Sequence, residues 1–493
     1  MSNRAAGTRC ARTASSRDAG ASKRALRTRR DKISRMAIEH TAETLKSVIK
    51  AYDIRGVVGE TIDEDFVRVA GAAFAHVLRK EGETRIAVGH DMRPSSPSLS
   101  EAFAEGAASQ GLDVTLLGLT STDELYFVAG TQRCAGAMFT ASHNPAQYNG
   151  IKLCRAGATP VSTDTGLGEI ARMILEGVPD FGGEPGAVDK HDALDEYAAY
   201  LRELVPVPTG RTLVVAVDAA NGMAGMTVPA VLGELDIDIR PLYFELDGTF
   251  PNHEANPLDP KNLVDLQKFT VEQGADIGLA FDGDADRCFV VDERGEAVSP
   301  SAITALIATR TLAQHPGATI IHNLITSRAV PEIIEEHGGT AVRTRVGHSY
   351  IKAQMAQHSA LFGGEHSAHY YFSEFFNADS GLVAALHVLA ALAEQDGPLS
   401  ALMQEYDRYA ASGEINSEVA DQAAATQRVV DAFADRAETV DTLDGVTVQL
   451  KDSKAWFNVR ASNTEPLLRL NAEAPTKEEV DALTSEILAI IRA

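Results

Sequence analysis

Cysteine is scarce in this chain of 493 residues, and its four cysteines show no paired spacing. They are Cys10, Cys134, Cys154 and Cys288. The pattern argues against a disulfide framework and against a cysteine-based zinc site. It favours a reducing, cytoplasmic location, because disulfides persist mainly in oxidising compartments.

Long hydrophobic runs are also missing. A membrane-spanning helix needs about 20 consecutive apolar residues, and the longest apolar stretch, 382–393, is interrupted by His387. Asp379 or Ser380 as N-cap and Gly397-Pro398 as a stop predict a buried helix at this place. We therefore expect no membrane partner.

Positive charge is in short supply, because 45 Lys and Arg face 69 Asp and Glu and the net charge is −24. Such a balance argues against nucleic acid as a partner. The first 35 residues differ, with eleven basic residues against Asp18 and Asp31. An Arg-rich targeting segment is one explanation for this leader. We favour a disordered basic leader over residues 1–43 or a start codon placed too early, since Met36 precedes the first structured pattern.

Three similar segments follow the leader. Each is a short apolar strand that ends in a polar loop and is followed by helical signals. The expected strands are 85–91, 213–218 and 319–323, and the helices after them are 99–109, 223–232 and 329–337. Repeated strand–loop–helix units predict α/β domains that bind ligands at the carboxyl ends of their strands.

The last eighty residues have a different pattern. Alternating apolar residues at 446–450 follow the turn pair Asp444-Gly445, and a capping box at Thr476 and Glu479 opens a C-terminal helix. This predicts a smaller α+β domain. The expected division is a leader at 1–43 and domains at 44–188, 189–298, 299–412 and 413–493.

The segment Thr140-Ala-Ser-His-Asn-Pro145 places a serine next to an imidazole. Asn-Pro favours a turn, because a proline disfavours the helical region for the residue before it. We therefore expect the hydroxyl of Ser142 to be exposed on a loop, where it can act as a nucleophile or carry phosphate. An ordinary turn is the alternative for this segment taken alone.

Three carboxylates, Asp282, Asp284 and Asp286, alternate between two apolar stretches. They would repel one another strongly unless a hard divalent cation bound their oxygens. Such a site leaves positions for a substrate oxygen. Arg287 stands where an EF-hand needs glycine, so we expect a Mg²⁺ site rather than an EF-hand or a solvated acidic turn.

Two further segments carry polar groups suited to a phosphorylated sugar. Glu365, Ser367 and His369 alternate, so in an extended loop they share one side. A second group puts guanidinium groups and short side chains that donate hydrogen bonds in one turn. This composition favours a phosphate-binding site, and an N-capped turn is the alternative. The members of this group are Arg460, Ser462, Asn463, Thr464 and the nearby Arg469. Together the four segments suggest phosphoryl transfer to and from a sugar.

These four motifs, in this order, resemble those of the α-D-phosphohexomutase superfamily, and within it the phosphomannomutase/phosphoglucomutase group. The resemblance runs from about Ala51 to the C-terminus. It implies three βα-type mixed-sheet α/β domains and a C-terminal α+β domain, related to TATA-binding-protein-like folds, around a central cleft. It also implies a phosphomannomutase that interconverts mannose 1-phosphate and mannose 6-phosphate and uses a hexose 1,6-bisphosphate as intermediate and activator.

The resemblance also implies roles for individual residues. Ser142 would carry the phosphate, with Mg²⁺ bound to it and to the three aspartates, while Arg287 stabilises phosphate oxygens. Arg55 and Lys152 would lie near the phosphoserine, and His348 on the ligand side of the third domain. His143 and Lys152 are the candidates for proton transfer, with His369 as a weaker alternative.

Other functions stay open at this point. A phosphoglucomutase or phosphoglucosamine mutase is the nearest alternative, although Glu365, Ser367 and His369 suit a mannose/glucose-type sugar loop. A phosphosugar phosphatase and a non-catalytic phosphosugar-binding protein are more distant alternatives. We expect hexose phosphates as partners and a monomer or weak homodimer.

Overall fold

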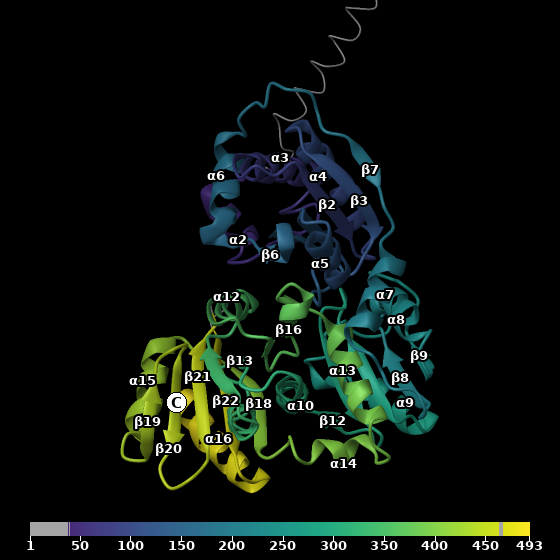
Figure 1. The fold of residues 1–493 in the computed structure, drawn as a ribbon. Helices are drawn as coiled ribbons and strands as arrows, with labels where there is room; N and C mark the ends of the chain where they lie inside the picture. The colour runs from purple at the N-terminus through teal and green to yellow at the C-terminus, as the bar shows by residue number, and fades with distance from the viewer. Residues whose placement is uncertain (1–37, 39, 463–466) are drawn as a thin grey trace, which may run out of the picture.

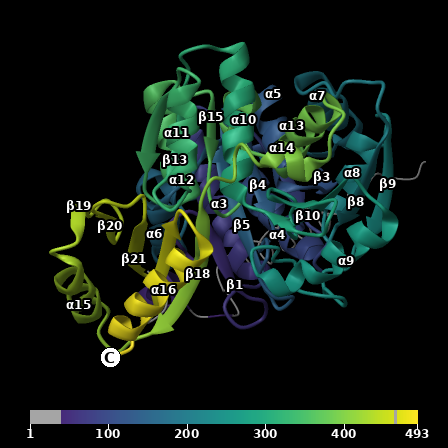
Figure 2. The same cartoon turned by 90° about the horizontal axis from the view of Figure 1, so that it is seen from below.

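The computed structural model describes residue 38 and residues 40–462 and 467–493. Most of the expected leader therefore lies outside the described residues, and its last two residues begin the helix α2 (Ala42–Val48). Figure 1 shows one α/β unit above and three further units below it. Figure 2, seen from below, shows α16 and β18 beside the third unit.

The first unit contains the mixed sheet β1-β5-β4-β2-β3-β7, with β6 paired to β5. Strands β4, β2, β3 and β7 run parallel, whereas β5 is antiparallel to β1 and β4. The strands are β1 (Ile54–Val57), β2 (Arg85–His90), β3 (Asp113–Leu119), β4 (Ala135–Phe139), β5 (Tyr148–Arg155), β6 (Thr159–Pro160) and β7 (Val188–Lys190). The helices are α3 (Glu64–Lys80), α4 (Ser96–Ser109), α5 (Thr122–Thr131) and α6 (Gly168–Glu176). The expected boundary between residues 188 and 189 falls inside β7.

The second unit contains the sheet β12-β11-β10-β8-β9, in which β10, β8 and β9 are parallel. Its strands are β8 (Leu213–Asp218), β9 (Ile237–Leu242), β10 (Ile277–Phe281), β11 (Cys288–Asp292) and β12 (Ala297–Val298). Its helices are α7 (Leu194–Leu204), α8 (Ala224–Leu232) and α9 (Val264–Gln273). The loop with the three aspartates is the turn of the antiparallel hairpin β10–β11.

The third unit contains the sheet β14-β13-β15-β16-β17, in which β14, β13 and β15 are parallel. Its strands are β13 (Thr319–Asn323), β14 (Thr340–Thr344), β15 (Phe362–Gly364), β16 (Tyr370–Phe372) and β17 (Ala378–Asp379). Its helices are α10 (Pro300–Gln314), α11 (Ala329–Glu336), α12 (His348–His358), α13 (Gly381–Ala393) and α14 (Leu399–Met403). The expected buried helix is thus confirmed as α13, and the hydroxyl of Ser380 caps it by accepting from the Val383 amide.

The C-terminal unit contains the antiparallel sheet β18-β22-β21-β20-β19 with two helices, which confirms the expected α+β fold. Its strands are β18 (Ala410–Glu418), β19 (Ala437–Asp441), β20 (Val446–Leu450), β21 (Trp456–Ala461) and β22 (Leu467–Ala474). Its helices are α15 (Gln422–Phe433) and α16 (Lys477–Ile491), the latter capped by Thr476.

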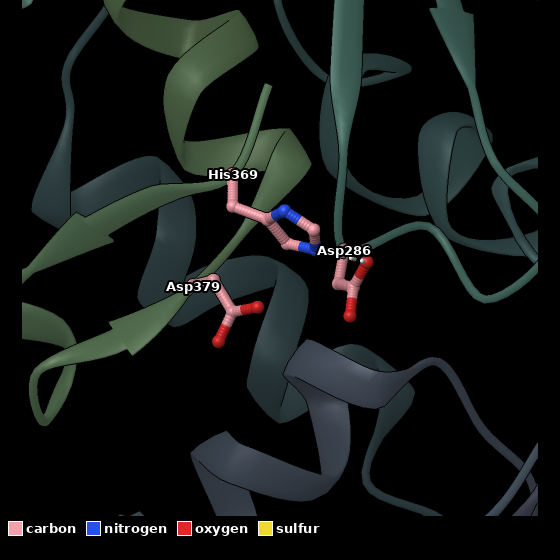
Figure 3. A group of neighbouring side chains, drawn as sticks. All are labelled: Asp286, His369 and Asp379. Atoms are coloured by element: carbon pink, nitrogen blue, oxygen red, sulfur yellow. Dashed lines mark ion pairs between the residues drawn. The ribbon is translucent and has the colours of Figure 1, made fainter. Parts of the chain in front are cut away.

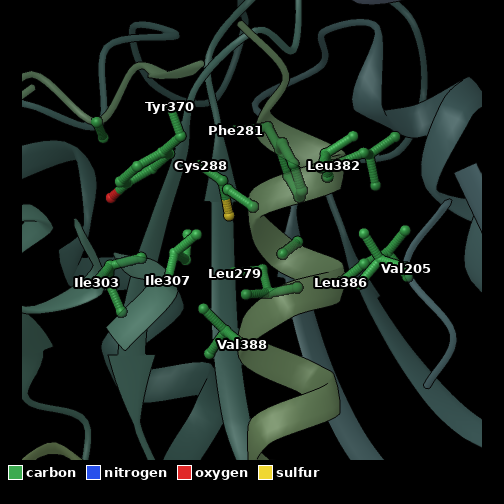
Figure 4. Close-up of a cluster of buried hydrophobic side chains, with 14 of the residues drawn as sticks. Val205, Leu279, Phe281, Cys288, Ile303, Ile307, Tyr370, Leu382, Leu386 and Val388 are labelled. Atoms are coloured by element: carbon green, nitrogen blue, oxygen red, sulfur yellow. The ribbon is translucent and has the colours of Figure 1, made fainter. Parts of the chain in front are cut away.

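Hydrophobic packing joins the middle of the molecule. The second and third units share one core with α5, whereas the C-terminal unit closes a core of its own. In the shared core, Leu279 and Phe281 of β10 lie against Leu382 and Leu386 of α13 (Figure 4). Each fully buried leucine contributes about 1.5–3 kcal/mol. This packing fixes the hairpin that carries the three aspartates.

Within the described residues, no helix combines the length and apolar composition that crossing a bilayer requires. The described cysteines Cys134, Cys154 and Cys288 are buried and free. Cys10 lies outside the described residues.

Candidate active site

Ser142 lies on the loop between β4 and β5. Its backbone has a φ of +50°, a left-handed conformation that costs a non-glycine residue of order 1 kcal/mol or more. The amide of Ser142 donates to Thr140 Oγ1 at 2.9 Å, which holds this conformation. Surrounding contacts must offset the free energy of this strain, and strained residues of this kind are typical of functional loops.

The expectation of an exposed serine hydroxyl is wrong, because Ser142 is only 5% exposed. Its Oγ donates to Asp282 Oδ2 at 2.7 Å, and Arg287 Nη2 donates to Oγ at 3.2 Å. The Nδ1 atom of His143 lies 3.2 Å from the same Oγ. The acidic loop of the second unit thus covers the serine of the first. The resemblance implied that the two loops meet at one metal ion, but not that the serine hydroxyl is buried.

A buried arginine that sequence reasoning missed supports the serine loop. Arg93 directs its Nη1 and Nη2 groups at backbone carbonyls of this loop, and its Nε donates to Asp91 Oδ2 at 3.2 Å. The carbonyls are those of Ser142, Asn144, Pro145 and Tyr148, at 2.7–3.0 Å. Arg93 is 1% exposed. Its position, just after the expected strand 85–91, was the only signal in the sequence.

The three aspartates lie together as expected. Asp282, Asp284 and Asp286 are at most 1% exposed, and one oxygen from each lies within 4.8 Å of the others. In the described part of the structure, Asp284 Oδ1 and Asp286 Oδ1 are buried without a hydrogen-bond partner. Orphaned buried carboxylate oxygens at this spacing fit a divalent cation, which takes oxygen ligands.

Lys152 of β5 provides positive charge at the same place. Its Nζ lies 2.6 Å from Asp284 Oδ2 and 2.5 Å from Asp286 Oδ2. Burial alone would lower the pKa of Lys152, but Asp284 and Asp286 outweigh burial and raise this pKa well above its usual value. Burial, aided by Asp284, raises the pKa of Asp286 to about 7. Arg287 Nη2 also lies 2.8 Å from Asp282 Oδ2, so two cationic side chains face the three carboxylates.

The imidazole of His143 is held in its neutral form. Burial lowers the pKa of His143 well below its usual value, and the charges of Arg287 and Arg55 lower it further. Arg287 Nη2 also contacts His143 Nδ1 directly. Arg55 of β1 pairs with Asp53 and donates to Asn144 of the serine loop. A neutral imidazole beside Ser142 can accept a proton.

The sugar-loop residues reach the same region from the third unit. His369 Nδ1 lies 3.0 Å from Ser367 Oγ, and its Nε2 lies 3.7 Å from Asp286 Oδ1. Figure 3 shows the ring of His369 directed toward Asp286, with Asp379 nearby. A backbone bridge between Arg287 and His369 brings the two loops into contact.

Glu365 is fixed by several donors. Its Oε2 accepts from the hydroxyl of Tyr371 at 2.7 Å, and its Oε1 accepts from the Gly347 amide at 3.0 Å. Gly347 precedes His348, the first residue of α12, whose side chain lies outside the described part of the structure. Tyr371 was not predicted, because its role depends on the pairing of β16 with β15.

The predicted phosphate loop is described only in part. Arg460 and Arg469 face each other on β21 and β22, and Ser462 follows β21. Asn463 and Thr464 lie outside the described residues. Glu414 of β18 contacts both arginines. Sequence reasoning missed Glu414.

Comparisons with known proteins cover nearly the whole described chain. Models of the phosphoglucomutase/phosphomannomutase family match its alpha/beta/alpha domain I at residues 46–177, domain II at 195–295, domain III at 299–409 and C-terminal domain at 414–490.

Individual relatives agree with the family models. A phosphomannomutase of Salmonella montevideo is 38% identical over 90% of this chain and 98% of its own length. A Xanthomonas campestris protein named phosphohexose mutases is 39% identical over the same shares of the two chains. A crystal structure of a phosphoglucomutase/phosphomannomutase family protein from Burkholderia thailandensis has a TM-score of 0.82 at 30% identity, covering 90% of this chain and 97% of that one. The mixed sheets, the serine and acidic loops and these comparisons agree: the chain belongs to the phosphoglucomutase/phosphomannomutase family.

Proposed function

We propose that this protein is a phosphomannomutase, which interconverts mannose 1-phosphate and mannose 6-phosphate through phosphorylated Ser142 and a hexose 1,6-bisphosphate. One observation supports this above all others: Ser142 Oγ lies 2.7 Å from Asp282 Oδ2, beside a buried group of three aspartates. A serine next to such a cation site is suited to phosphoryl transfer, which depends mainly on positioning and charge neutralisation.

We assign Mg²⁺ as the metal, held by Asp282, Asp284, Asp286 and the phosphate on Ser142. Bound there, it would neutralise negative charge on the phosphate oxygens. Arg287 adds a guanidinium within 3.2 Å of Ser142 Oγ. Arg287 can therefore stabilise the negative charge on the phosphate while the phosphate passes between Ser142 Oγ and the sugar oxygen.

Each half-reaction balances with residues of this chain. A free hydroxyl of the sugar phosphate attacks the phosphorus on Ser142, the bond from phosphorus to Oγ breaks, and Ser142 takes up a proton. The neutral imidazole of His143, whose Nδ1 lies 3.2 Å from Ser142 Oγ, can accept the proton of the sugar hydroxyl and pass it to Oγ as the bond to phosphorus breaks. Lys152 is the second candidate for this proton transfer, and His369 is a weaker alternative. The bisphosphate then turns around and returns its other phosphate to Ser142 by the reverse step.

The sugar specificity is proposed from the third unit. Glu365 is held rigidly by Tyr371 and Gly347, and Ser367 and His369 stand beside it, so the loop presents fixed acceptors to sugar hydroxyls. The second candidate is phosphoglucomutase activity, which the family description favours equally. A phosphoglucosamine mutase is the next alternative.

The test is a coupled assay on the 1-phosphates of mannose, glucose and glucosamine, with a trace of hexose 1,6-bisphosphate as activator. We expect the highest turnover with mannose 1-phosphate and a gain of one phosphate in intact mass after bisphosphate treatment. Ser142→Ala should lose both. Full turnover by Ser142→Ala, or phosphate release without isomer formation, would overturn the proposal.

Further parts of the proposal concern the whole protein. We propose domains at 44–188, 189–298, 299–412 and 413–493, and a monomer or weak homodimer that binds hexose phosphates and no nucleic acid. The cytoplasmic location stays a prediction from the unpaired cysteines.

A further inference from the structure

Helix α5 of the first unit begins against the acidic loop of the second unit. Its first residue, Thr122, is fully buried. The Thr122 hydroxyl donates to Asp284 Oδ2 at 2.6 Å, and the Thr122 amide donates to the Asp284 carbonyl at 3.1 Å. The two residues are 162 positions apart in the chain. The contact therefore arises only from the packing of the two units, which sequence patterns do not show.

The start of α5 is held in place from both neighbouring units. Asp123, the next residue, accepts a hydrogen bond at 2.6 Å from the hydroxyl of Tyr197 in the second unit. It accepts another at 2.6 Å from the hydroxyl of Ser380 in the third. The helix also packs into the core that these two units share. The Thr122 hydroxyl therefore has a fixed position relative to the acidic loop.

The two oxygens of the Asp284 carboxylate have different surroundings. Oδ2 accepts from the Thr122 hydroxyl and from Lys152 Nζ, each at 2.6 Å. In the described part of the chain, Oδ1 is buried and has no hydrogen-bond partner. Donors that bind one oxygen of a carboxylate orient the other oxygen toward a metal ion. Oδ1 is therefore the oxygen of Asp284 that is left to bind a cation together with the other two aspartates.

Of the two donors to Oδ2, threonine is the more rigid. Lys152 ends in an ammonium on a flexible four-carbon stem, and its Nζ also contacts Asp286 Oδ2 at 2.5 Å. It is also a candidate for proton transfer, so its contact with Asp284 can change during the reaction. The side chain of Thr122 is β-branched and restricted in χ1. The threonine hydroxyl is thus the donor that keeps Asp284 in one orientation.

Phosphorylation of Ser142 leaves this contact intact but removes a similar one. In the unphosphorylated protein, Ser142 Oγ donates its proton to Asp282. When Oγ takes the phosphate from a sugar, its proton passes to the sugar oxygen that gives up the phosphate, and Oγ can no longer donate. Thr122 takes no part in the transfer and keeps its proton. It is therefore a hydroxyl that the first unit retains on the acidic loop throughout the cycle.

We propose that Thr122 is a positioning residue of the metal site, which orients Asp284 so that Oδ1 binds the divalent cation. This inference rests on the metal site of the proposed function. Thr122 contacts a metal ligand and not the reacting atoms. Loss of an outer hydrogen-bond partner of this kind usually costs about 10–100-fold in metal affinity or activity. Loss of the hydroxyl should therefore weaken cation binding.

The experiment removes the hydroxyl and keeps the shape of the side chain. Thr122→Val also keeps the backbone hydrogen bond to Asp284. Thr270→Val on α9 is the matched control, because Thr270 is also fully buried and its hydroxyl donates to the Leu266 carbonyl at 2.8 Å. In calorimetric titration of unphosphorylated protein with Mg²⁺, Thr122→Val should bind about 10–100-fold more weakly than wild type. Thr270→Val should bind as wild type.

Two further variants keep the test decisive if Thr122→Val does not fold. Thr122→Ser and Thr122→Ala both lack the threonine methyl group and differ from each other only in the hydroxyl. Thr122→Ser should bind Mg²⁺ with close to wild-type affinity. It should bind about 10–100-fold more tightly than Thr122→Ala.

Turnover provides a second measurement. The Mg²⁺ concentration for half-maximal turnover should rise in Thr122→Val by the same factor as the Mg²⁺ dissociation constant. KM for the hexose phosphate should equal that of wild type once Mg²⁺ is saturating. A general loss of structure would lower kcat without changing the Mg²⁺ requirement.

The outcomes separate this inference from the proposed function. Equal Mg²⁺ affinity in Thr122→Val and Thr270→Val, or in Thr122→Ser and Thr122→Ala, would overturn the inference. A wild-type protein that binds no Mg²⁺ would overturn it as well. If Mg²⁺ binding depends on the Thr122 hydroxyl but wild-type protein turns over no hexose phosphate, the proposed function fails and the inference stands.

Discussion

The carbonyl oxygen of Ser142 accepts a 2.9 Å hydrogen bond from Nη2 of Arg93, a residue 49 positions earlier in the chain. An arginine side chain has five N–H donors, and every one of them has an acceptor here. The acceptors are one Asp91 oxygen and the carbonyls of Ser142, Asn144, Pro145 and Tyr148. The Arg93 guanidinium therefore fixes the backbone of the loop that carries Ser142, the proposed carrier of the phosphate.

Arg93→Lys should lower kcat roughly 100-fold, because an ammonium cannot hold four carbonyls and small displacements of a reacting group are costly. It should also reduce the free energy of unfolding by about 3–5 kcal/mol, the usual cost of breaking a buried charged network. Steady-state kinetics and chemical denaturation measure the two effects. Arg172→Lys, on the exposed side of α6, is the matched control and should behave as wild type.

Gly248→Ala tests the support that Arg93 gives to the serine loop without removing a charge. An added Cβ at Gly248 would lie 2.4 Å from Cα of Arg93, so the second unit would have to move away from the backbone that carries Arg93. We expect a loss of 1–3 kcal/mol, the usual cost of overpacking, and a reduced kcat. In Gly397→Ala the new Cβ meets only the end of the flexible Gln395 side chain, so this control should keep full activity. Unchanged kcat in Gly248→Ala would contradict the predicted coupling.

Removal of divalent metal should abolish turnover, and Mg²⁺ should restore it. Binding should also raise the melting temperature of wild-type protein, because a ligand that binds only the folded state stabilises it. Asp284→Asn should lose this shift, since it removes one of three buried carboxylates. Differential scanning fluorimetry with and without Mg²⁺ checks the prediction, and an undiminished shift in the variant would place the metal elsewhere.

Stability should depend on pH through Asp123. Burial raises the pKa of this carboxyl to about 6, although hydroxyls of Ser121, Ser380 and Tyr197 donate to it. The unfolded value is about 3.9, so the folded state binds the proton more tightly and stability falls as pH rises from about 4 through 6, by roughly 3 kcal/mol. The melting temperature of Asp123→Asn should vary less over this range than that of wild type. An identical pH profile in both proteins would show that Asp123 is ionised throughout.

Much of the fold follows from local pattern. The strands β2, β8 and β13 end within a residue of their apolar runs, and the acidic loop joins two strands as its flanks indicated. The local sequence pattern did not predict contacts between segments that are far apart in the chain. Ser142 is buried because an arginine and an aspartate from another unit cover it. Arg93 was missed because its carbonyl acceptors lie 49–55 residues away in the chain. Glu414 was missed because Arg460 and Arg469 lie on other strands of the sheet.

The C-terminal unit closes a hydrophobic core that includes none of the residues of the shared central core. Ion pairs such as Arg343 with Asp441 and Glu332 with Lys454 cross its boundary with the third unit. Pairs of this kind exchange readily with water, at little net cost. The C-terminal unit can therefore shift relative to the third unit without disturbing the packing of the shared central core.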